Sequence, residues 1–174
     1  EKVISTVKPD CVLVYGDINS TLAGALAAAK VGIPLAHVEA GLRSYNRTMP
    51  EEVNRVLTDH VSRWLFCPTD AAVQNLEKEG ITKGVHQIGD VMYDALLRNL
   101  ELSRTKSNIL KRMNLRKGEY ALATVHRAGN TDNPNNMQSI LDALGSLPTR
   151  VIFPVHPRAR KRIEEWKFIV NLNV

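Results

Sequence analysis

Short apolar runs and longer mixed segments alternate along the chain, and this pattern predicts strands and helices in turn. Apolar runs of strand length occur at 12–15, 33–38, 64–67, 85–88, 120–125, 150–155 and 168–170. Segments of helical composition separate most of them, at 21–30, from 50 onward, and at 70–79, 137–144 and 161–166. Strands that alternate with helices at this spacing are typical of an α/β fold with parallel sheets.

Residues that favour helix ends mark the predicted boundaries. Residues 19–21, Asn-Ser-Thr, are expected to cap the Ala-rich helix that follows, and Thr69 is expected to cap a later helix that ends at Gly80. Pro50 fits the first turn of a helix, where its missing N–H has no partner to lose. Residues 131–136 form a polar loop in this interpretation.

One long stretch interrupts the alternation. Residues 91–116 contain no strand-like run and become increasingly basic toward their end. The chain is therefore predicted to have three parts. Residues 1–90 belong to a first Rossmann-like domain, 91–117 form a helical connector, and 118–174 belong to a second Rossmann-like domain.

The net charge restricts the function. The 174 residues carry a formal charge of +5, and the basic residues gather at 104–117 and 158–162. Because no aromatic residues interleave with them, solvated helix faces are expected and nucleic-acid binding is not. A cleft for a phosphorylated small molecule uses only a few arginines and fits the same charge.

Cysteine content and hydropathy indicate the compartment. Cys11 and Cys67 both lie in apolar runs, so buried thiols in a reducing, cytoplasmic compartment are expected. No Cys and His spacing resembles a metal site. No run is long enough to span a membrane, and no signal-peptide pattern is present, so no membrane association is expected. Because the sequence starts at Glu1 rather than Met, it is interpreted as a piece of a longer protein.

Charged and imidazole side chains recur directly after the predicted strands. The carboxyl ends of parallel strands meet at one edge of a sheet, where ligands bind in open α/β folds. Two plainer interpretations stay open: an acid there caps the next helix, or a histidine there is a satisfied structural group. The residues concerned are Asp17, Glu39, His126 with Arg127, and His156.

The segment 37–55 concentrates such groups. Glu39 ends a buried strand, Glu51 lies in the first turn of the helix from Pro50, and Arg55 follows four residues later on the same face. Two carboxylates and a guanidinium on one cleft suit acid/base chemistry on an anionic substrate. A surface Glu51–Arg55 salt bridge is the plainer alternative. Asp59 on this helix is interpreted as structural. No Walker loop or Gly-x-Gly-x-x-Gly motif supports ATP or NAD.

Five motifs together resemble the non-hydrolysing UDP-N-acetylglucosamine 2-epimerases, in the family's order and over nearly the whole chain. They are Tyr15–Thr21, His37–Arg43, Met49–Arg55, Thr124–Arg127 and Pro154–Pro157. The resemblance implies an α/β, glycosyltransferase-B-like architecture of two doubly wound parallel-sheet domains, both incomplete in this chain. The family's early Gly-Thr-Arg-Pro-Glu segment and later Ser-Gly-Gly segment are missing, so the chain matches about half of a member.

The resemblance also implies a reaction. The family epimerises C2 of UDP-N-acetylglucosamine without an external cofactor, by eliminating UDP to give 2-acetamidoglucal and then adding UDP back. Asp17, Glu39 and Glu51 match the catalytic acids, while Arg55 and His126 match residues near the substrate diphosphate. Nucleotide-sugar contacts, including those of an allosteric site in some members, are implied for Arg43, Arg127 and His156. The family suggests a homodimer.

Two departures keep alternatives open. Ile18 stands where the family usually has Thr, and Gly129 stands where it usually has Glu beside the His126 motif. The parent protein is expected to be an epimerase, and the piece alone to be inactive. Competing interpretations are a 2-epimerase of a UDP-di-acetamido uronic acid, a hydrolysing relative that releases free N-acetylmannosamine, and a non-catalytic nucleotide-sugar-binding module.

Overall fold

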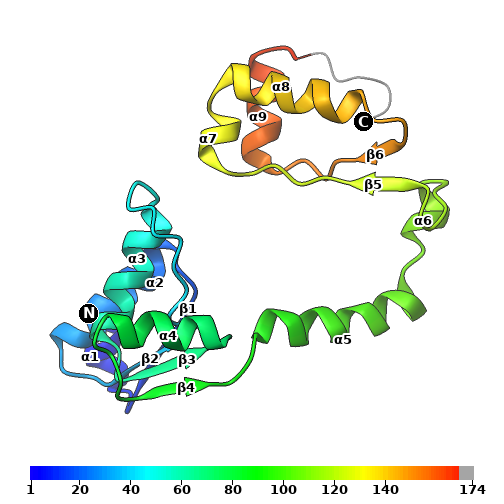
Figure 1. Cartoon of the computed structure of the whole chain (residues 1–174). Helices are drawn as coiled ribbons and strands as arrows, with labels where there is room; N and C mark the ends of the chain where they lie inside the picture. The colour runs from blue at the N-terminus through cyan, green and yellow to red at the C-terminus, as the bar shows by residue number, and fades with distance from the viewer. Residues whose placement is uncertain (169–174) are drawn as a thin grey trace. The chain divides into compact units, whose positions relative to one another are not determined.

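The computed structural model describes residues 1–168, which form two compact units (Figure 1). The first unit runs from Glu1 to Glu101, and the second begins at Leu102. The domain limits at 90 and 117 stay a prediction. Within residues 1–168, no helix is both long and apolar enough to cross a membrane.

The first unit is built on a parallel sheet of four strands. The strands lie in chain order, each paired in parallel with the next. This confirms the parallel sheet predicted from the alternating pattern, with the last strand one residue shorter than expected. The strands are β1 (Val12–Tyr15), β2 (Leu35–Val38), β3 (Trp64–Cys67) and β4 (Val85–Gln87).

Helices connect these strands, and their ends show which capping predictions hold. Thr69 caps α4 as predicted, because its hydroxyl accepts the Ala72 N–H at 3.2 Å. The predicted cap of α2 by residues 19–21 is wrong, since α2 starts at Asn19 and its N-cap Ile18 has no side-chain acceptor. The helices are α1 (Lys2–Val7), α2 (Asn19–Lys30), α3 (Pro50–Val61) and α4 (Asp70–Lys78).

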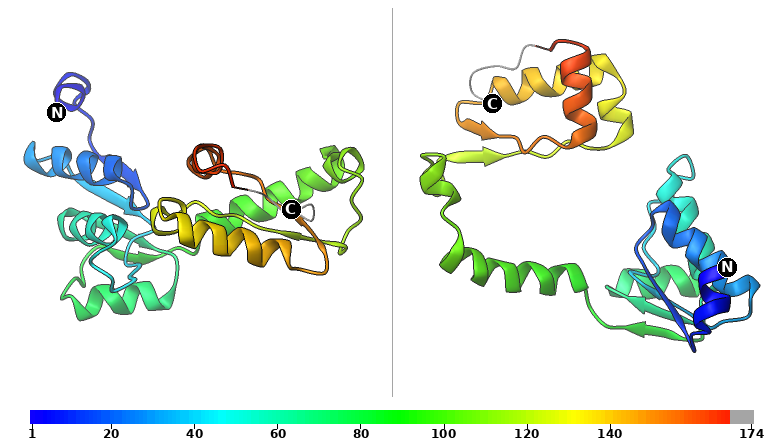
Figure 2. Two further views of the ribbon diagram at one scale, coloured as in Figure 1. Left: turned by 90° about the horizontal axis from the view of Figure 1, so that it is seen from above. Right: turned by 180° about the vertical axis from the view of Figure 1, so that it is seen from behind.

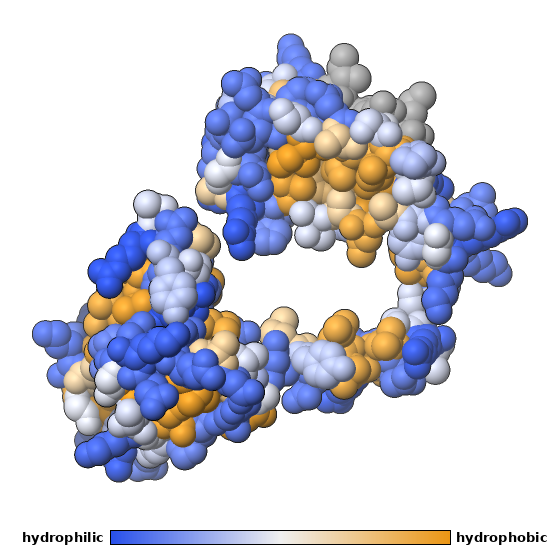
Figure 3. Space-filling model, viewed as in Figure 1, coloured by the Kyte–Doolittle hydropathy of each residue, from blue (hydrophilic) through white to orange (hydrophobic). Residues whose placement is uncertain are grey.

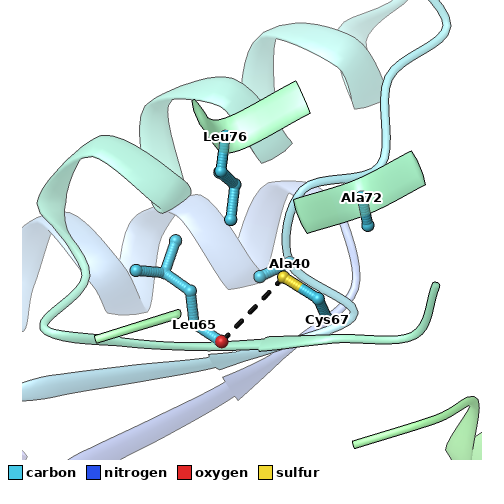
Figure 4. Close-up of a cluster of buried hydrophobic side chains, with 5 residues drawn as sticks. All are labelled: Ala40, Leu65, Cys67, Ala72 and Leu76. Atoms are coloured by element: carbon cyan, nitrogen blue, oxygen red, sulfur yellow. Dashed lines mark hydrogen bonds between the residues drawn. The ribbon is translucent and has the colours of Figure 1, made fainter. Parts of the chain in front are cut away.

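One face of this sheet carries most of the core. Paired residues of neighbouring parallel strands point to the same side, so Val14, His37 and Leu65 share this face. Helix α2 packs on β1 and β2, and α4 packs on β3 (Figures 1 and 4). The two clusters are Val14, Ala25, Ala28 and Leu35, and Ala40, Leu65, Cys67, Ala72 and Leu76.

The two cysteines differ. Cys67 is fully buried in the second cluster, as predicted, and its burial raises the pKa of the thiol to about 11 (Figure 4). The prediction of a buried Cys11 is wrong. Cys11 precedes β1 instead of lying in it, and its side chain is exposed.

The stretch predicted as a connector contains α5 (Val91–Lys106) and α6 (Ile109–Arg112). Neither helix buries a residue. Apolar side chains therefore remain on the surface of α5 (Figure 3). Those more than a third exposed are Val91, Met92, Tyr93, Leu96, Leu97, Leu100 and Leu102.

The second unit contains a two-stranded parallel sheet, and helices both precede and follow its first strand (Figure 2). Its core cluster of Met137, Leu141 and Ala159 lies between α8 (Pro134–Gly145) and α9 (Pro157–Glu165). The strands are shorter than predicted, and two other predictions are wrong: residues 131–136 are partly helical, and the last helix starts at Pro157 rather than 161. The expected strand at 168–170 falls largely outside the described residues. The elements are β5 (Tyr120–Leu122), α7 (Ala128–Thr131), α8 (Pro134–Gly145), β6 (Arg150–Ile152) and α9 (Pro157–Glu165).

Candidate active site

The turns after β1 and β2 bring two predicted acids to the same edge of the sheet. Gly16 ends β1 with φ +63°, and its N–H donates to the Val38 carbonyl at 3.1 Å. A Cβ on Gly16 would lie 3.1 Å from Glu39 Oε2. The backbone of the first turn therefore passes directly beside the Glu39 carboxylate, and Asp17 follows in the next position.

Arg55 on α3 joins this edge. Its Nη2 donates to Asp17 Oδ2, so the acid is ion-paired rather than serving as a side-chain cap of α2. The side chain of Arg55 is 15% exposed and that of Asp17 is 31% exposed. Arg55 Nε is buried and has no hydrogen-bond partner in the described part of the chain. The guanidinium is thus held in place while keeping an unused donor, which is suited to an anionic ligand.

Glu51 lies apart from this ion pair. It is exposed, and the alternative of a surface Glu51–Arg55 salt bridge is not found among the described residues. Arg55 contacts Glu52 instead, with Nη1 3.4 Å from Glu52 Oε2. Glu51 is therefore on the same helical turn as the site, with a solvent-facing carboxylate.

Glu52 has a role that the sequence pattern did not reveal. Its carboxylate is 3% exposed and accepts the Ser44 N–H at 2.8 Å, the Ser44 hydroxyl at 2.9 Å and the Tyr45 N–H at 2.9 Å. Burial alone would raise the pKa of Glu52, but these hydrogen bonds and the Arg55 charge outweigh burial and lower it. Glu52 therefore fastens the loop before α3 to the first turn of that helix.

A buried polar network supports the second turn. Asp59 on α3 is fully buried, and its carboxylate faces His37 Nδ1 at 2.6 Å, the Gly41 N–H at 3.1 Å and Arg43 Nη1 at 2.7 Å. Arg43 also forms a bidentate salt bridge with Glu79, in which Nε and Nη2 each donate to one carboxylate oxygen at 2.7 Å. The structural interpretation of Asp59 is confirmed by these contacts.

Arg43 has a different role from the ligand contact that the resemblance implies. Its side chain is 1% exposed, and its guanidinium is occupied by Asp59 and Glu79. Burial alone would lower the pKa of Arg43, but its carboxylate partners raise it above the ordinary value. This fully paired, buried guanidinium holds the loop after β2 against α3 and α4, and we propose no ligand contact for it.

The second unit places its predicted residues differently. His126 and Arg127 follow β5, and His156 follows β6 as the N-cap of α9, where its Nδ1 accepts the Arg158 N–H at 3.2 Å. All three predicted residues are exposed. The rings of His126 and His156 have their centroids 6.0 Å apart, so these two strand ends do converge. No group of three or more His, Cys, Asp or Glu within residues 1–168 is arranged to hold a metal ion.

The structure shows the local environment of Ile18 and Gly129, the two residues that depart from the family pattern. Ile18 replaces a residue type that would supply an N-cap oxygen, which explains why α2 has no side-chain cap. Gly129 lies in α7, and a Cβ there would meet nothing within 4 Å. Its carbonyl accepts from Asn136 Nδ2 at 2.9 Å. No steric demand therefore requires a glycine at position 129.

Comparison with known proteins decides the family. A family model described as UDP-N-acetylglucosamine 2-epimerase matches residues 1–173. The chain belongs to the UDP-N-acetylglucosamine 2-epimerase family. The resemblance carried by the five motifs is thus confirmed.

Individual relatives of this chain are also named as 2-epimerases of UDP-sugars. A UDP-N-acetylglucosamine 2-epimerase homolog of Methanococcus maripaludis is 55% identical over 99% of this chain and 48% of its own length. The UDP-2,3-diacetamido-2,3-dideoxy-D-glucuronate 2-epimerase of Pseudomonas aeruginosa is 48% identical over 100% of this chain and 49% of its own length. The chain spans about half the length of these relatives.

The fold comparison supports the same family. The crystal structure of Methanocaldococcus jannaschii UDP-GlcNAc 2-epimerase in complex with UDP-GlcNAc and UDP has a TM-score of 0.86 at 45% identity. The match covers 95% of this chain and 47% of that one. Together with the two parallel sheets, this likeness confirms the predicted α/β, glycosyltransferase-B-like fold class.

Proposed function

We propose that the complete protein interconverts UDP-N-acetylglucosamine and UDP-N-acetylmannosamine by inversion at C2. The observation that carries this proposal is the Asp17–Arg55 ion pair beside the Glu39 carboxylate, at the carboxyl edge of a parallel sheet in a member of this family. Inversion needs a base to take the C2 proton, an acid on the opposite face, and a cation for the departing diphosphate. This edge supplies carboxylates for the first two roles and a guanidinium for the third.

The roles follow from the residue types. Asp17, Glu39 and Glu51 serve as the acids and bases, and Arg55 stabilises the negative charge on the diphosphate as the C1–O bond breaks. His126 in the second unit contacts the diphosphate, and Arg127 and His156 contribute to nucleotide-sugar binding. No external cofactor is needed, because UDP leaves and adds back to the 2-acetamidoglucal intermediate.

Proton NMR in D2O with the complete protein and UDP-N-acetylglucosamine tests the proposal. Loss of the C2 proton signal with appearance of UDP-N-acetylmannosamine is expected. The Glu39→Gln variant keeps the size of the side chain and removes its basicity, so exchange should fall by a factor between about 10² and 10⁴. Release of free N-acetylmannosamine would identify a hydrolase, and UDP binding without exchange would identify a non-catalytic module. Residues 1–174 alone are expected to be inactive.

A second substrate has specific support. The di-acetamido-glucuronate 2-epimerase of P. aeruginosa is 48% identical to this chain, close to the 45% of a UDP-N-acetylglucosamine 2-epimerase of M. maripaludis. C2-proton exchange assays with both UDP-sugars, run in parallel, would decide between the two substrates. The preferred substrate is the one with the higher kcat/KM.

The assembly and compartment are also proposed. We expect a homodimer in the cytoplasm, supported by the family and by the apolar side chains exposed on α5. Sedimentation of the complete protein as a monomer at working concentrations would reject the dimer.

A further inference from the structure

The two turns that carry Asp17 and Glu39 are tied to the same buried pair of side chains. His37 Nε2 lies 2.9 Å from the carbonyl oxygen of Gly16, the residue before Asp17. Asp59 Oδ2 accepts the N–H of Gly41, two residues after Glu39, at 3.1 Å. His37 and Asp59 themselves are 2.6 Å apart. One continuous chain of hydrogen bonds therefore runs from the first turn to the second.

The contacts of His37 fix the position of one ring proton. A backbone carbonyl can only accept, so Nε2 must donate to Gly16. Nδ1 contacts Asp59 Oδ1, while Asp59 Oδ2 accepts from the buried Arg43 guanidinium and from the Gly41 N–H. The side chains of His37 and Asp59 are both 0% exposed.

The turn after β2 has a backbone that needs such support. Glu39 has φ +69°, a left-handed conformation that non-glycine residues rarely adopt, and Gly41 has φ +78°. Gly41 is held from two sides, because its N–H donates to Asp59 and its carbonyl accepts from Asn75 Nδ2 at 3.0 Å. Strained backbone at a site persists only when its surroundings hold it in place.

We propose that His37 and Asp59 are positioning residues for the proposed epimerisation. They set the separation and direction of the two acids through the Gly16 carbonyl and the Gly41 amide. Neither residue reaches substrate, because both are fully buried. The inference rests on the proposed function, in which both acids must address one carbon atom from fixed places.

Steady-state kinetics of C2 exchange in the complete protein tests this role. His37→Phe fills the same space and removes both hydrogen bonds, so kcat should fall on the order of 100-fold while KM changes little. Asp59→Ala should do the same. Asp59→Asn keeps an acceptor for the Gly41 N–H and should recover part of the loss.

Glu79→Gln is the matched control. Glu79 belongs to the same ion-pair network but contacts neither Gly16 nor Gly41, so its kcat should stay within about twofold of wild type even if thermal stability drops. If kcat instead falls in step with stability in all four variants, the network is merely structural and the positioning role is overturned. An unchanged kcat in His37→Phe would overturn it too.

A spectroscopic measurement separates this inference from the function on which it rests. A ¹⁵N-edited spectrum of the wild-type protein should show an Nε2–H signal of His37 that exchanges slowly with solvent, and its absence would overturn the hydrogen bond to Gly16 and with it the chain. A folded wild-type protein without any C2 exchange would overturn the proposed function, and the positioning role with it. An active wild type with an equally active His37→Phe variant would overturn the positioning role alone.

Discussion

The two units place polar side chains at the same position, after parallel strands, but they support them in different ways. In the first unit, Asp17 is ion-paired and the Glu39 turn rests on a fully buried network. In the second unit, His126, Arg127 and His156 are exposed. The alternating pattern of the chain is enough to bring such groups to a sheet edge. Holding them there requires buried partners from neighbouring helices.

The difference extends to the sheets. The first unit has four parallel strands, whereas the second has two strands of three residues each in its described part. Parallel strands are normally covered on both faces within larger sheets, so a pair of short strands adds little stability by itself. Substitutions at the first site should therefore affect stability more than those at the second.

Gly41→Ala should have the largest effect. A Cβ at Gly41 would lie 2.3 Å from the Ala72 carbonyl oxygen, a backbone atom of α4 that cannot rotate away. The substitution also places an L side chain at φ +78°. We expect the first unit to lose more than about 4 kcal/mol in free energy of unfolding, measured by urea denaturation.

Gly80→Ala separates the two causes. Gly80 has nearly the same backbone conformation, φ +79°, but nothing lies within 4 Å of its added Cβ. The substitution should cost about 1–2 kcal/mol, the penalty of the left-handed conformation alone. Equal losses in the two variants would contradict the idea that α4 is packed against the Glu39 turn.

Glu52→Gln should have the next largest effect, and it should depend on pH. The folded protein lowers the pKa of Glu52 below its ordinary value. The carboxylate therefore adds stability that is fully present above the ordinary glutamate pKa and is lost as pH falls through the lowered one. At pH 7 the variant should be less stable by about 2 kcal/mol, a typical value for hydrogen bonds to a buried charge.

Denaturation at pH 7 and at about pH 3, below the ordinary glutamate pKa, measures this difference. The gap between wild type and Glu52→Gln should narrow at the lower pH. Glu51→Gln is the control for stability, because Glu51 is exposed on the same helical turn and its loss should change stability by less than about 0.5 kcal/mol. A gap that widens toward acid would show that the hydrogen bonds from Ser44 and Tyr45 do not favour the ionised form.

Much of the fold could be predicted because its signals are local. The strands at 12–15 and 64–67 and the helix from Pro50 are apolar or capped segments that a short window of sequence reveals. Helix α7 was missed, because three of its four residues, Gly129, Asn130 and Thr131, have low helix propensity. The helix instead packs against α8 and α9, and α9 lies outside a short window of sequence. The strand ends at 123–125 and 153–155 were overestimated for a similar reason: apolar residues there pack on helices without extending the ladder.

The candidate site could be predicted only in part. Position after a strand identified Asp17 and Glu39, since topology alone delivers them to the edge. The partner of Arg55 could not be predicted, because helical spacing offers only Glu51, whereas the ion pair reaches across 38 residues to Asp17. The buried contacts of Glu52 and Arg43 likewise depend on which element packs beside them, which no local spacing reports.

His156→Ala should have a smaller effect on stability than the Gly41 and Glu52 substitutions in the first unit. The variant removes the ring nitrogen that accepts the Arg158 N–H at the start of α9. Loss of an N-cap acceptor costs about 1 kcal/mol. His156→Asn offers an acceptor in the same place and should restore most of it, as thermal denaturation would show. If Asn fails to restore stability, the ring contributes through its contact with His126 and not as a cap.

Arg127→Gln should have the smallest effect on stability. Arg127 is exposed, and its side chain makes no hydrogen bond or ion pair with other residues in the part of the chain that the structure describes. The free energy of unfolding should change by less than about 0.5 kcal/mol. Its guanidinium is free to meet a phosphate, so binding of UDP to the complete protein, measured by calorimetry, should weaken by roughly tenfold or more.

Arg160→Gln is the matched control for Arg127→Gln. It removes an exposed arginine of α9 and the same amount of positive charge, so UDP binding should stay unchanged if the effect of Arg127 is a local contact and not a consequence of net charge. Equal weakening in both variants would point to the overall charge instead. A loss of stability in Arg127→Gln would show that the second unit also builds its site from structural side chains, and the contrast between the units would fail.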